Sequence, residues 1–262
     1  MAMSANSVFH FTNSLDNLLG ILKNEFCIRY SLEETIYIEE QAIPMVCFCD
    51  IPLAQTKNHM DTYGTYGLGV SKKWAKEKGL NPVLYLQHYS LLHKNLKYVS
   101  RHAAKKIVEQ WESKEPQEKE IAWATVLNWA TILNIVRYVK ISEGTLFKDP
   151  PKEGVKFYEE RKWRYIPNVF VSSSRMSALP SLPFLTKANF EDEPTRHIEE
   201  KKLENYKLTF VPNDMKYVIV NNEDEISEII KQLRTIKGKF PPESVDILCS
   251  RILTSEQIKK DF

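Results

Sequence analysis

Short apolar segments bounded by Pro or Gly are interspersed with helix-like segments along the whole chain, and this pattern restricts the fold most strongly. In "SVFHFTN", Val8 and His10 fall on one strand face and Phe9 and Phe11 on the other, because side chains alternate along a strand. Further strands are predicted at "IPMVCFCDIP", "YGLGVS", "NPVLYL", "YKLTF", "KYVIV" and "VDILCS". Because strands and helices do not alternate strictly, the sequence predicts an α+β fold rather than a doubly wound α/β fold.

The predicted helices begin and end at recognisable capping residues. Thr12 or Ser14 caps the helix "SLDNLLGILKNE", and Ser71 opens "KKWAKEKG", which Gly79 ends. Gly64 ends a short helix in "LAQTKNHMDTYG". Three more helices are predicted at "EPTRHIEEKKLE", "DEISEIIKQLRTI" and "TSEQIKKDF".

The most apolar run, residues 121–139, has a polar residue at every third position. It predicts a helix buried in the core rather than a membrane span, because it contains two Asn and ends near Arg137. Together with the preceding helix it forms a predicted helical insertion around residues 89–140 in a single domain of residues 1–262. The charged break "ESKEPQEKE" is either a solvated loop or a partner-binding segment.

Composition narrows the class of protein. An apolar fraction of 43% and a charged fraction of 27% are typical of a soluble globular protein, and a net charge of +2 implies no strong attraction to nucleic acid or membrane. The start of the chain lacks the features of a signal peptide, so we expect a cytoplasmic protein whose four Cys are reduced thiols. Without a Gly-rich phosphate loop, a bound nucleotide would not be held by a Rossmann or P-loop device.

The stretch "KFYEERKWRYIP", Lys156–Pro167, concentrates charged and aromatic residues and reads as a strand closed by Pro. In a strand, Glu159 and Glu160 would point to opposite faces, so one could be buried among aromatics. A buried carboxylate needs a partner or a function, and Arg161 or Arg164 could favour its ionised form. The alternative is a ladder of ion pairs on the strand.

Other candidate site residues lie far from this stretch in sequence. His10 stands in a strand between two Phe, where a core histidine is an equal alternative, and Tyr63 shares a helix face with His59. Tyr66 follows close on Gly64 and could equally be a core aromatic. Cys47, Cys49 and His59 do not have the spacing or the fourth ligand of a structural zinc site, so we expect no metal.

A His, an aromatic residue and a carboxylate together match the needs of cleaving the nicotinamide–ribose bond of NAD. The carboxylate would stabilise an oxocarbenium-like sugar, the His would hold the ribose hydroxyls, and the aromatic ring would stack on nicotinamide. This chemistry requires neither a metal nor a Gly-rich loop.

The order of motifs resembles the AbiGi family of abortive phage-resistance proteins over nearly the whole chain, most specifically in "CFCDIPL", "YGTYGLGVSKKWA" and "FYEERKWRY". That family is usually labelled as the antitoxin half of a two-gene phage-defence system. The resemblance therefore implies a phage-defence function and a cognate toxin or antitoxin protein as partner. A non-catalytic antitoxin would hold this partner through "ESKEPQEKE" or the charged C-terminal half.

The same order is more remotely similar to ADP-ribosyltransferase-like proteins, which implies a split, mainly antiparallel sheet with flanking helices and NAD as co-substrate. The resemblance assigns catalysis to Glu160 and NAD binding to a further set of residues: His10, Thr12, Arg29 (toward the pyrophosphate), and Tyr63 or Tyr66. The Ser-Thr-Ser strand and the Glu-x-Glu pair of those proteins are not present in this sequence, which leaves the acceptor open between protein, nucleic acid and water.

Overall fold

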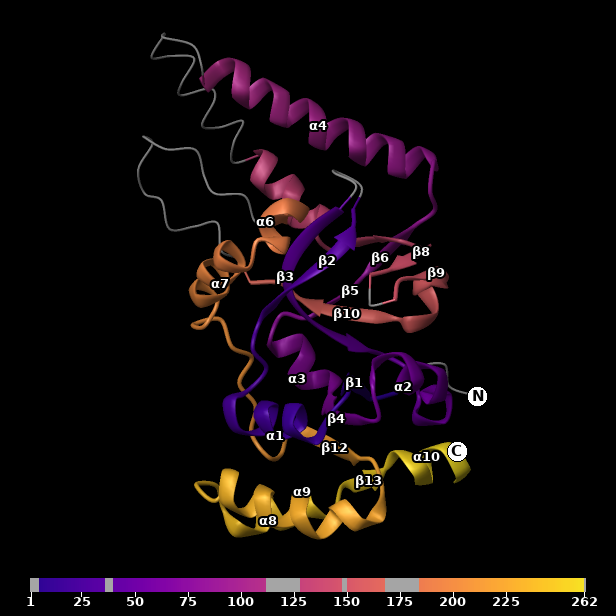
Figure 1. The fold of residues 1–262 in the computed structure, drawn as a ribbon, viewed down its shortest axis with the longest axis vertical. Helices are drawn as coiled ribbons and strands as arrows, with labels where there is room; N and C mark the ends of the chain where they lie inside the picture. Colours follow the sequence, from indigo (N-terminus) through magenta and orange to yellow (C-terminus); the bar gives the residue numbers. More distant parts are fainter. Residues whose placement is uncertain (1–4, 36–39, 112–127, 148–149, 168–183, 262) are drawn as a thin grey trace.

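The computed structural model describes residues 5–35, 40–111, 128–147, 150–167 and 184–261. The charged break "ESKEPQEKE" lies outside these residues, as do residues 168–183. The described chain has the predicted α+β architecture, with a mainly antiparallel sheet flanked by helices (Figure 1).

The central sheet has β1, β3 and β4 in its middle, the later strands β10, β12 and β13 outside them, and the short β5 at one edge. The strand order is β13-β12-β4-β1-β3-β10-β5, and all of these neighbours are antiparallel except β12 and β13. The strands of this path are β1 (Ser7–Thr12), β3 (Glu40–Cys49), β4 (Tyr66–Ser71), β5 (Asn81–Pro82), β10 (Lys162–Tyr165), β12 (Met215–Val220) and β13 (Ile252–Thr254).

Strand β3 changes partners halfway along its length. Its end pairs with β10 and, through Cys49 and Phe9, with β1. Its beginning pairs with β2 (Arg29–Glu34), starting at Met45, and with β11 (Leu185–Thr186). The ladder between β1 and β3 therefore ends at one residue pair, and the two strands diverge from His10 onward.

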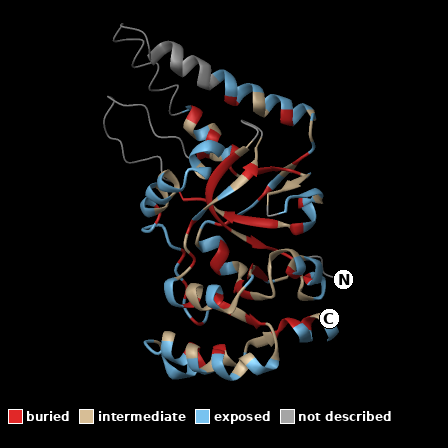
Figure 2. Cartoon of the chain, in the orientation of Figure 1, coloured by how far each residue is buried: buried red, intermediate tan, exposed pale blue. Residues whose placement is uncertain are grey.

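The alternation predicted for β1 places its side chains in two different cores. Val8 packs with Phe48, Leu68 and Trp74, on the face covered by α1 (Leu15–Asn24), α3 (Lys72–Glu77), α8 (Ile226–Ile236) and α9 (Pro242–Cys249). Phe9 and Phe11 pack on the opposite face against α2 (Lys57–Tyr63) and α10 (Ser255–Asp261). Figure 2 shows the buried residues concentrated along the strands between these layers.

Smaller strand pairs and further helices complete the fold around the central sheet. The pair of β6 (Leu84–Leu86) and β7 (Val139–Ile141) is parallel, and the pair of β8 (Glu143–Leu146) and β9 (Lys152–Lys156) is antiparallel. The long helix α4 (Leu91–Trp111) lies at one end of the molecule, and α8 and α9 lie at the other (Figure 1). Short helices fill the remaining positions: η1 (Leu53–Gln55), η2 (Phe157–Glu160), α6 (Lys187–Glu191), α7 (Glu193–Lys202) and η3 (Glu223–Glu225).

The described part of the predicted buried helix, residues 128–136, is amphipathic rather than buried all round. Trp129, Leu133 and Val136 are buried, whereas Thr131 and Ile135 are exposed. Within the described residues, no helix is long and apolar enough to cross a membrane.

Some predicted strands differ from the structure. "NPVLYL" is divided between β5 and β6, which belong to different sheets. The stretch from Lys156 begins with the last residue of β9 and continues as the 3-10 turn η2, and β10 starts only at Lys162, because Arg161 has left-handed backbone angles that end the turn. "VDILCS" belongs to helix α9, which begins at Pro242 and buries Val245 and Leu248 at helical spacing. "YKLTF" contributes a single bridge between Leu208 and Phe26.

Candidate functional site

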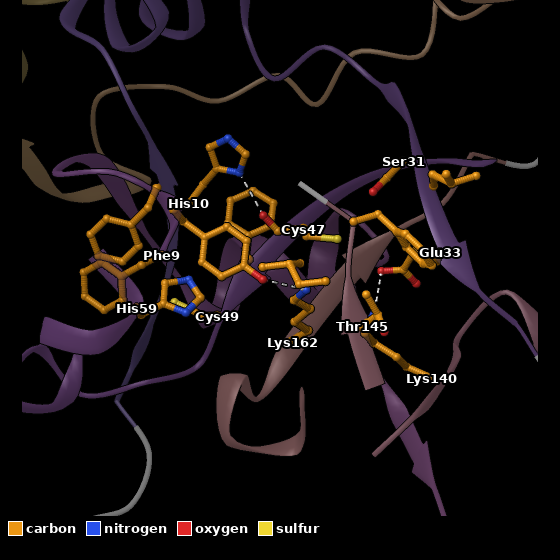
Figure 3. Close-up of a pocket in the computed structure, with 16 residues that line it drawn as sticks. Phe9, His10, Ser31, Glu33, Cys47, Cys49, His59, Lys140, Thr145 and Lys162 are labelled. Atoms are coloured by element: carbon orange, nitrogen blue, oxygen red, sulfur yellow. Dashed lines mark hydrogen bonds and ion pairs between the residues drawn. The ribbon is translucent and has the colours of Figure 1, made fainter. Parts of the chain in front are cut away.

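Three cavities adjoin one another, and two of them border the place where β1 and β3 diverge. A cavity of about 440 Å³ is bordered by His10, Thr12 and Arg29. A second, of about 210 Å³, shares His10 with the first and is also bordered by Tyr63, Lys140 and Lys162 (Figure 3). A third, of about 620 Å³, shares Tyr63 with the second and reaches Glu160. A ligand long enough to extend through all three cavities would contact these residues.

Glu160 is buried at the junction of the turn η2 and strand β10. Its Oε1 accepts a hydrogen bond of 2.5 Å from the Tyr63 hydroxyl at the end of α2, and its Oε2 lies 2.8 Å from Nζ of Lys162. The Tyr63 hydroxyl also lies 3.2 Å from Nζ of Lys162, so each of the three side chains contacts the other two. Burial opposes the charged form of Lys162, but the adjacent Tyr63 and Glu160 raise its pKa.

Glu159 and Glu160 differ in exposure, as expected, but for a different reason. The two residues lie in a 3-10 turn, which directs Glu160 inward and leaves Glu159 exposed. Neither predicted arginine faces Glu160: Arg161 lies 3.7 Å from Asp50, and Arg164 is paired with Glu33. The cation that pairs with Glu160 is therefore Lys162 rather than Arg161 or Arg164.

Glu33 anchors a second buried ion cluster beside the first. Its carboxylate lies 2.8 Å from Nζ of Lys140 and accepts a hydrogen bond from the fully buried guanidinium of Arg164. Arg164 also donates to the carbonyl oxygen of Arg137. Burial alone would raise the pKa of Glu33, but the cations of Arg164 and Lys140 lower it to about 2. These contacts link β2, β7 and β10 through their side chains.

His10 lies on the face of β1 opposite to Phe9 and Phe11, and it spans the gap where β1 and β3 diverge. Its Nδ1 lies 2.8 Å from the carbonyl oxygen of Cys47, to which a ring N–H donates, and the ring contacts Phe26 and Phe48. Burial lowers the pKa of His10, so its neutral form is favoured near pH 7 and Nε2 is left as an acceptor. His10 borders two of the cavities, but no described contact joins it to Glu160.

The other predicted binding residues are distributed unevenly. Thr12 and Arg29 border the first cavity, although the Arg29 side chain is 68% exposed and lies 3.6 Å from Glu200. Tyr66 borders none of the three cavities, because its hydroxyl donates to Glu225 and its ring packs in the core beside Leu68. Of the two candidate tyrosines, Tyr63 therefore borders these cavities and Tyr66 does not.

Three buried charged residues that border or support the site did not figure among the predicted residues: Glu33, Lys140 and Lys162. Lys162 lies two positions after Glu160 in a stretch rich in aromatic residues, and this proximity could have indicated that the two side chains form an ion pair. Glu33 stands among polar residues in the sequence and Lys140 between Val139 and Ile141, and in both cases only the fold shows that the charged side chain is buried. Among the described residues, no group of three or more His, Cys, Asp or Glu side chains could hold a metal ion.

Comparison with known proteins identifies relatives of the chain. Residues 24–221 match the profile of a family described as "abortive phage resistance protein AbiGi, antitoxin". An abortive phage resistance protein AbiGi of Lactococcus lactis subsp. cremoris is 30% identical over 246 residues, covering 88% of this chain and 93% of the relative. No solved structure matches the chain significantly.

Proposed function

The chain belongs to the AbiGi family of abortive phage resistance proteins, and we propose that it serves this defence as an NAD-dependent ADP-ribosyltransferase-like enzyme. The observation that supports the enzymatic part is the buried Glu160, which borders the third cavity and is fixed by Lys162 and by Tyr63, a residue shared by the second and third cavities. A carboxylate fixed in this way is preorganised, which is the property that stabilises a charge developing in a transition state.

The proposal gives each bordering residue one role. The ring of Tyr63 stacks on nicotinamide, and Nε2 of His10 accepts a hydrogen bond from a hydroxyl of the nicotinamide ribose. Thr12 and Arg29 contact the more distant part of NAD in the first cavity. Glu160 stabilises the positive sugar that forms as the ribose C1′–nitrogen bond breaks and nicotinamide leaves with the bonding electron pair. A protein, nucleic-acid or water nucleophile then bonds to C1′ and loses its proton.

Release of free nicotinamide tests this proposal directly. The purified chain is incubated with NAD in the presence of a bacterial lysate as acceptor source, and nicotinamide is measured with the Glu160→Gln variant beside it. We expect release by the parent and not by the variant. Equal release by the two would remove Glu160 from the mechanism, and no release by the parent would favour a binding function.

The alternative is a non-catalytic antitoxin that binds an acidic toxin protein, and two observations favour it. The family description names an antitoxin. The N-terminal half of α4 also exposes a set of large apolar side chains beside the cations Lys94 and Arg101: Leu91, Leu92, Tyr98 and Val99. Exposed apolar residues next to cations fit an acidic protein surface better than a nucleic acid. Co-purification of the chain with the product of a neighbouring gene tests this alternative.

A further inference from the structure

We propose that the cavity between Lys140 and Lys162 binds a phosphate or pyrophosphate group. This inference deepens the proposed function, because NAD carries a pyrophosphate, and it moves recognition of that group from the exposed Arg29 to two buried lysines. The anion site can also be tested without NAD.

The charge balance of the buried ion clusters is the first argument. Three cations (Lys140, Lys162 and Arg164) are buried together with two carboxylates (Glu33 and Glu160). With all three cations charged, the cluster carries one positive charge more than its carboxylates balance, and burial lowers the pKa of Lys140 because the charged form is costly there. A buried charge without a counter-charge is costly, so a bound anion would stabilise this arrangement.

Among the described residues, the nearest other titratable groups do not balance this charge from within the buried cluster: Glu34 is partly exposed and lies 3.2 Å from His88. Burial raises the pKa of the Cys47 thiol and of the Tyr63 and Tyr85 hydroxyls, so these groups are neutral near pH 7. The buried carboxylate Asp50 lies 2.7 Å from Nζ of Lys72 and 3.7 Å from Arg161. Its charge is thus already matched by cations outside the cluster.

The geometry of the two lysines is the second argument. Both border the cavity of about 210 Å³, into whose lining Ser31 and Thr145 bring hydroxyl groups (Figure 3). Nζ of Lys140 lies 3.9 Å and Nζ of Lys162 5.7 Å from the centre of the Phe157 ring, so both ammonium groups lie near the same aromatic side chain.

Lys140 has donors left for a ligand. An ammonium group carries three N–H donors, and among the described residues Nζ of Lys140 has one hydrogen-bond acceptor, Glu33 Oε1. Lysine binds phosphate as a point charge, and a site removed from water strengthens that attraction. Arg29 is less suited, because water screens its exposed guanidinium and Glu200 already lies beside it.

Titration of the full chain with inorganic pyrophosphate tests the site, by calorimetry and by thermal shift. We expect binding by the parent and a loss of affinity of about ten- to a hundredfold in Lys140→Met, the range for losing a hydrogen bond to a charged group. Lys140→Met leaves two cations facing two carboxylates, so the variant should fold. Lys140→Arg should keep most of the affinity, and Lys73→Met, which removes a lysine whose side chain is 85% exposed, should keep all of it.

Each outcome decides a separate point. A parent chain that does not bind pyrophosphate, or a Lys140→Met variant that binds it like the parent, overturns the anion site. Lys140-dependent pyrophosphate binding in a chain that releases no nicotinamide from NAD keeps the anion site and removes the NAD reaction. Nicotinamide release that is unchanged in Lys140→Met keeps the reaction and overturns the assignment of the NAD pyrophosphate to this cavity.

Discussion

Tyr63 donates a hydrogen bond of 2.5 Å to Glu160, although the two residues are 97 positions apart in the chain. The tyrosine ends helix α2, and the glutamate ends the 3-10 turn before β10. Lys162 lies within 3.2 Å of the tyrosine hydroxyl and 2.8 Å of the carboxylate. Each of the three side chains therefore depends on the other two for its position, which guides the choice of variants.

Glu160→Gln should lose stability as well as activity, because it leaves Lys162 buried without its counter-charge. Removing one partner of a buried ion pair typically costs about 3–5 kcal/mol. Adding Lys162→Met should return much of that loss in unfolding free energy, since the two sites are coupled. If the proposed reaction is correct, the double variant should still release nicotinamide at least about a hundredfold more slowly than the parent. Urea unfolding and the nicotinamide assay measure the two effects.

Glu159→Ala is the matched control for Glu160, because Glu159 occupies the same turn with an exposed side chain. We expect a change in unfolding free energy of less than about 0.5 kcal/mol and unchanged activity. A large effect of Glu159→Ala would show that the turn itself, and not the buried carboxylate, matters.

Tyr63 and Tyr66 should respond differently to substitution. Tyr63→Phe keeps the ring at the cavity and should keep the NAD-induced thermal shift, whereas Tyr63→Leu should lose it. Tyr66→Phe removes only a hydroxyl bound to Glu225 and should leave the shift intact. An NAD shift that depends on Tyr66 and not on Tyr63 would assign stacking to the other tyrosine.

Acid should destabilise the protein through Glu33. Its pKa is about 2 in the folded chain against an ordinary value of 4.5, so protonation favours the unfolded state. The stabilisation is present above about pH 4.5 and is lost as the pH falls toward 2, with a size of about 3 kcal/mol. Urea unfolding at several pH values should show this fall, and Glu33→Gln should be less stable at pH 7 but show a shallower dependence on acid. An equal slope in the variant and the parent would contradict the assignment.

Gly64 should tolerate no side chain. It has a φ of 113°, and an added Cβ would lie 2.1 Å from the carbonyl oxygen of Thr12. Gly64→Ala should therefore lower the unfolding free energy by at least about 2 kcal/mol, from backbone strain and displacement of β1. Gly20→Ala, inside α1 with open space at the same atom, should instead raise it by about 0.5–1 kcal/mol. Thermal denaturation of both variants checks the contrast.

The exposed half of α4 separates the two proposed functions. Tyr98→Glu places a negative charge in the apolar set beside Lys94 and Arg101, and should abolish co-purification with an acidic protein partner. Ile198→Glu makes the same kind of change at an exposed apolar position on α7 and should have no effect. Nicotinamide release should be unchanged in both. Equal capture of a partner by Tyr98→Glu and the parent would exclude this face of α4.

Local signals in the sequence were sufficient for much of the fold. The alternation around His10 and the Ser14 and Ser71 caps led to elements that the structure contains, and the apolar run before Pro52 led to β3, although that strand begins at Glu40 and includes Pro44. They succeed because each depends on neighbouring residues only. "VDILCS" misled because Val, Ile and Leu suit a strand as well as a short helix, and the Pro242 that starts α9 lies before the apolar run.

The candidate site was predictable only in part, for a physical reason. Glu160 and Tyr63 stand in stretches rich in aromatic residues, which marked them in advance. Their direct contact, and the burial of Glu33 and Lys140, depend on strands brought together from distant parts of the chain. No local pattern distinguishes a lysine that becomes buried from one on the surface, because the difference arises from the partners supplied by the fold.

The strand order has a consequence for how the chain is synthesised. β1, β3 and β4 occupy the middle of the sheet and leave the ribosome first, while β10, which covers the β3 side, and β12, which covers β4, follow much later. Until then the nascent chain presents two unpaired strand edges rich in apolar residues, and such edges promote association between chains. A gene product truncated before β12 would keep the open edge of β4 permanently. Premature termination of translation should therefore yield an aggregating fragment rather than a smaller working protein.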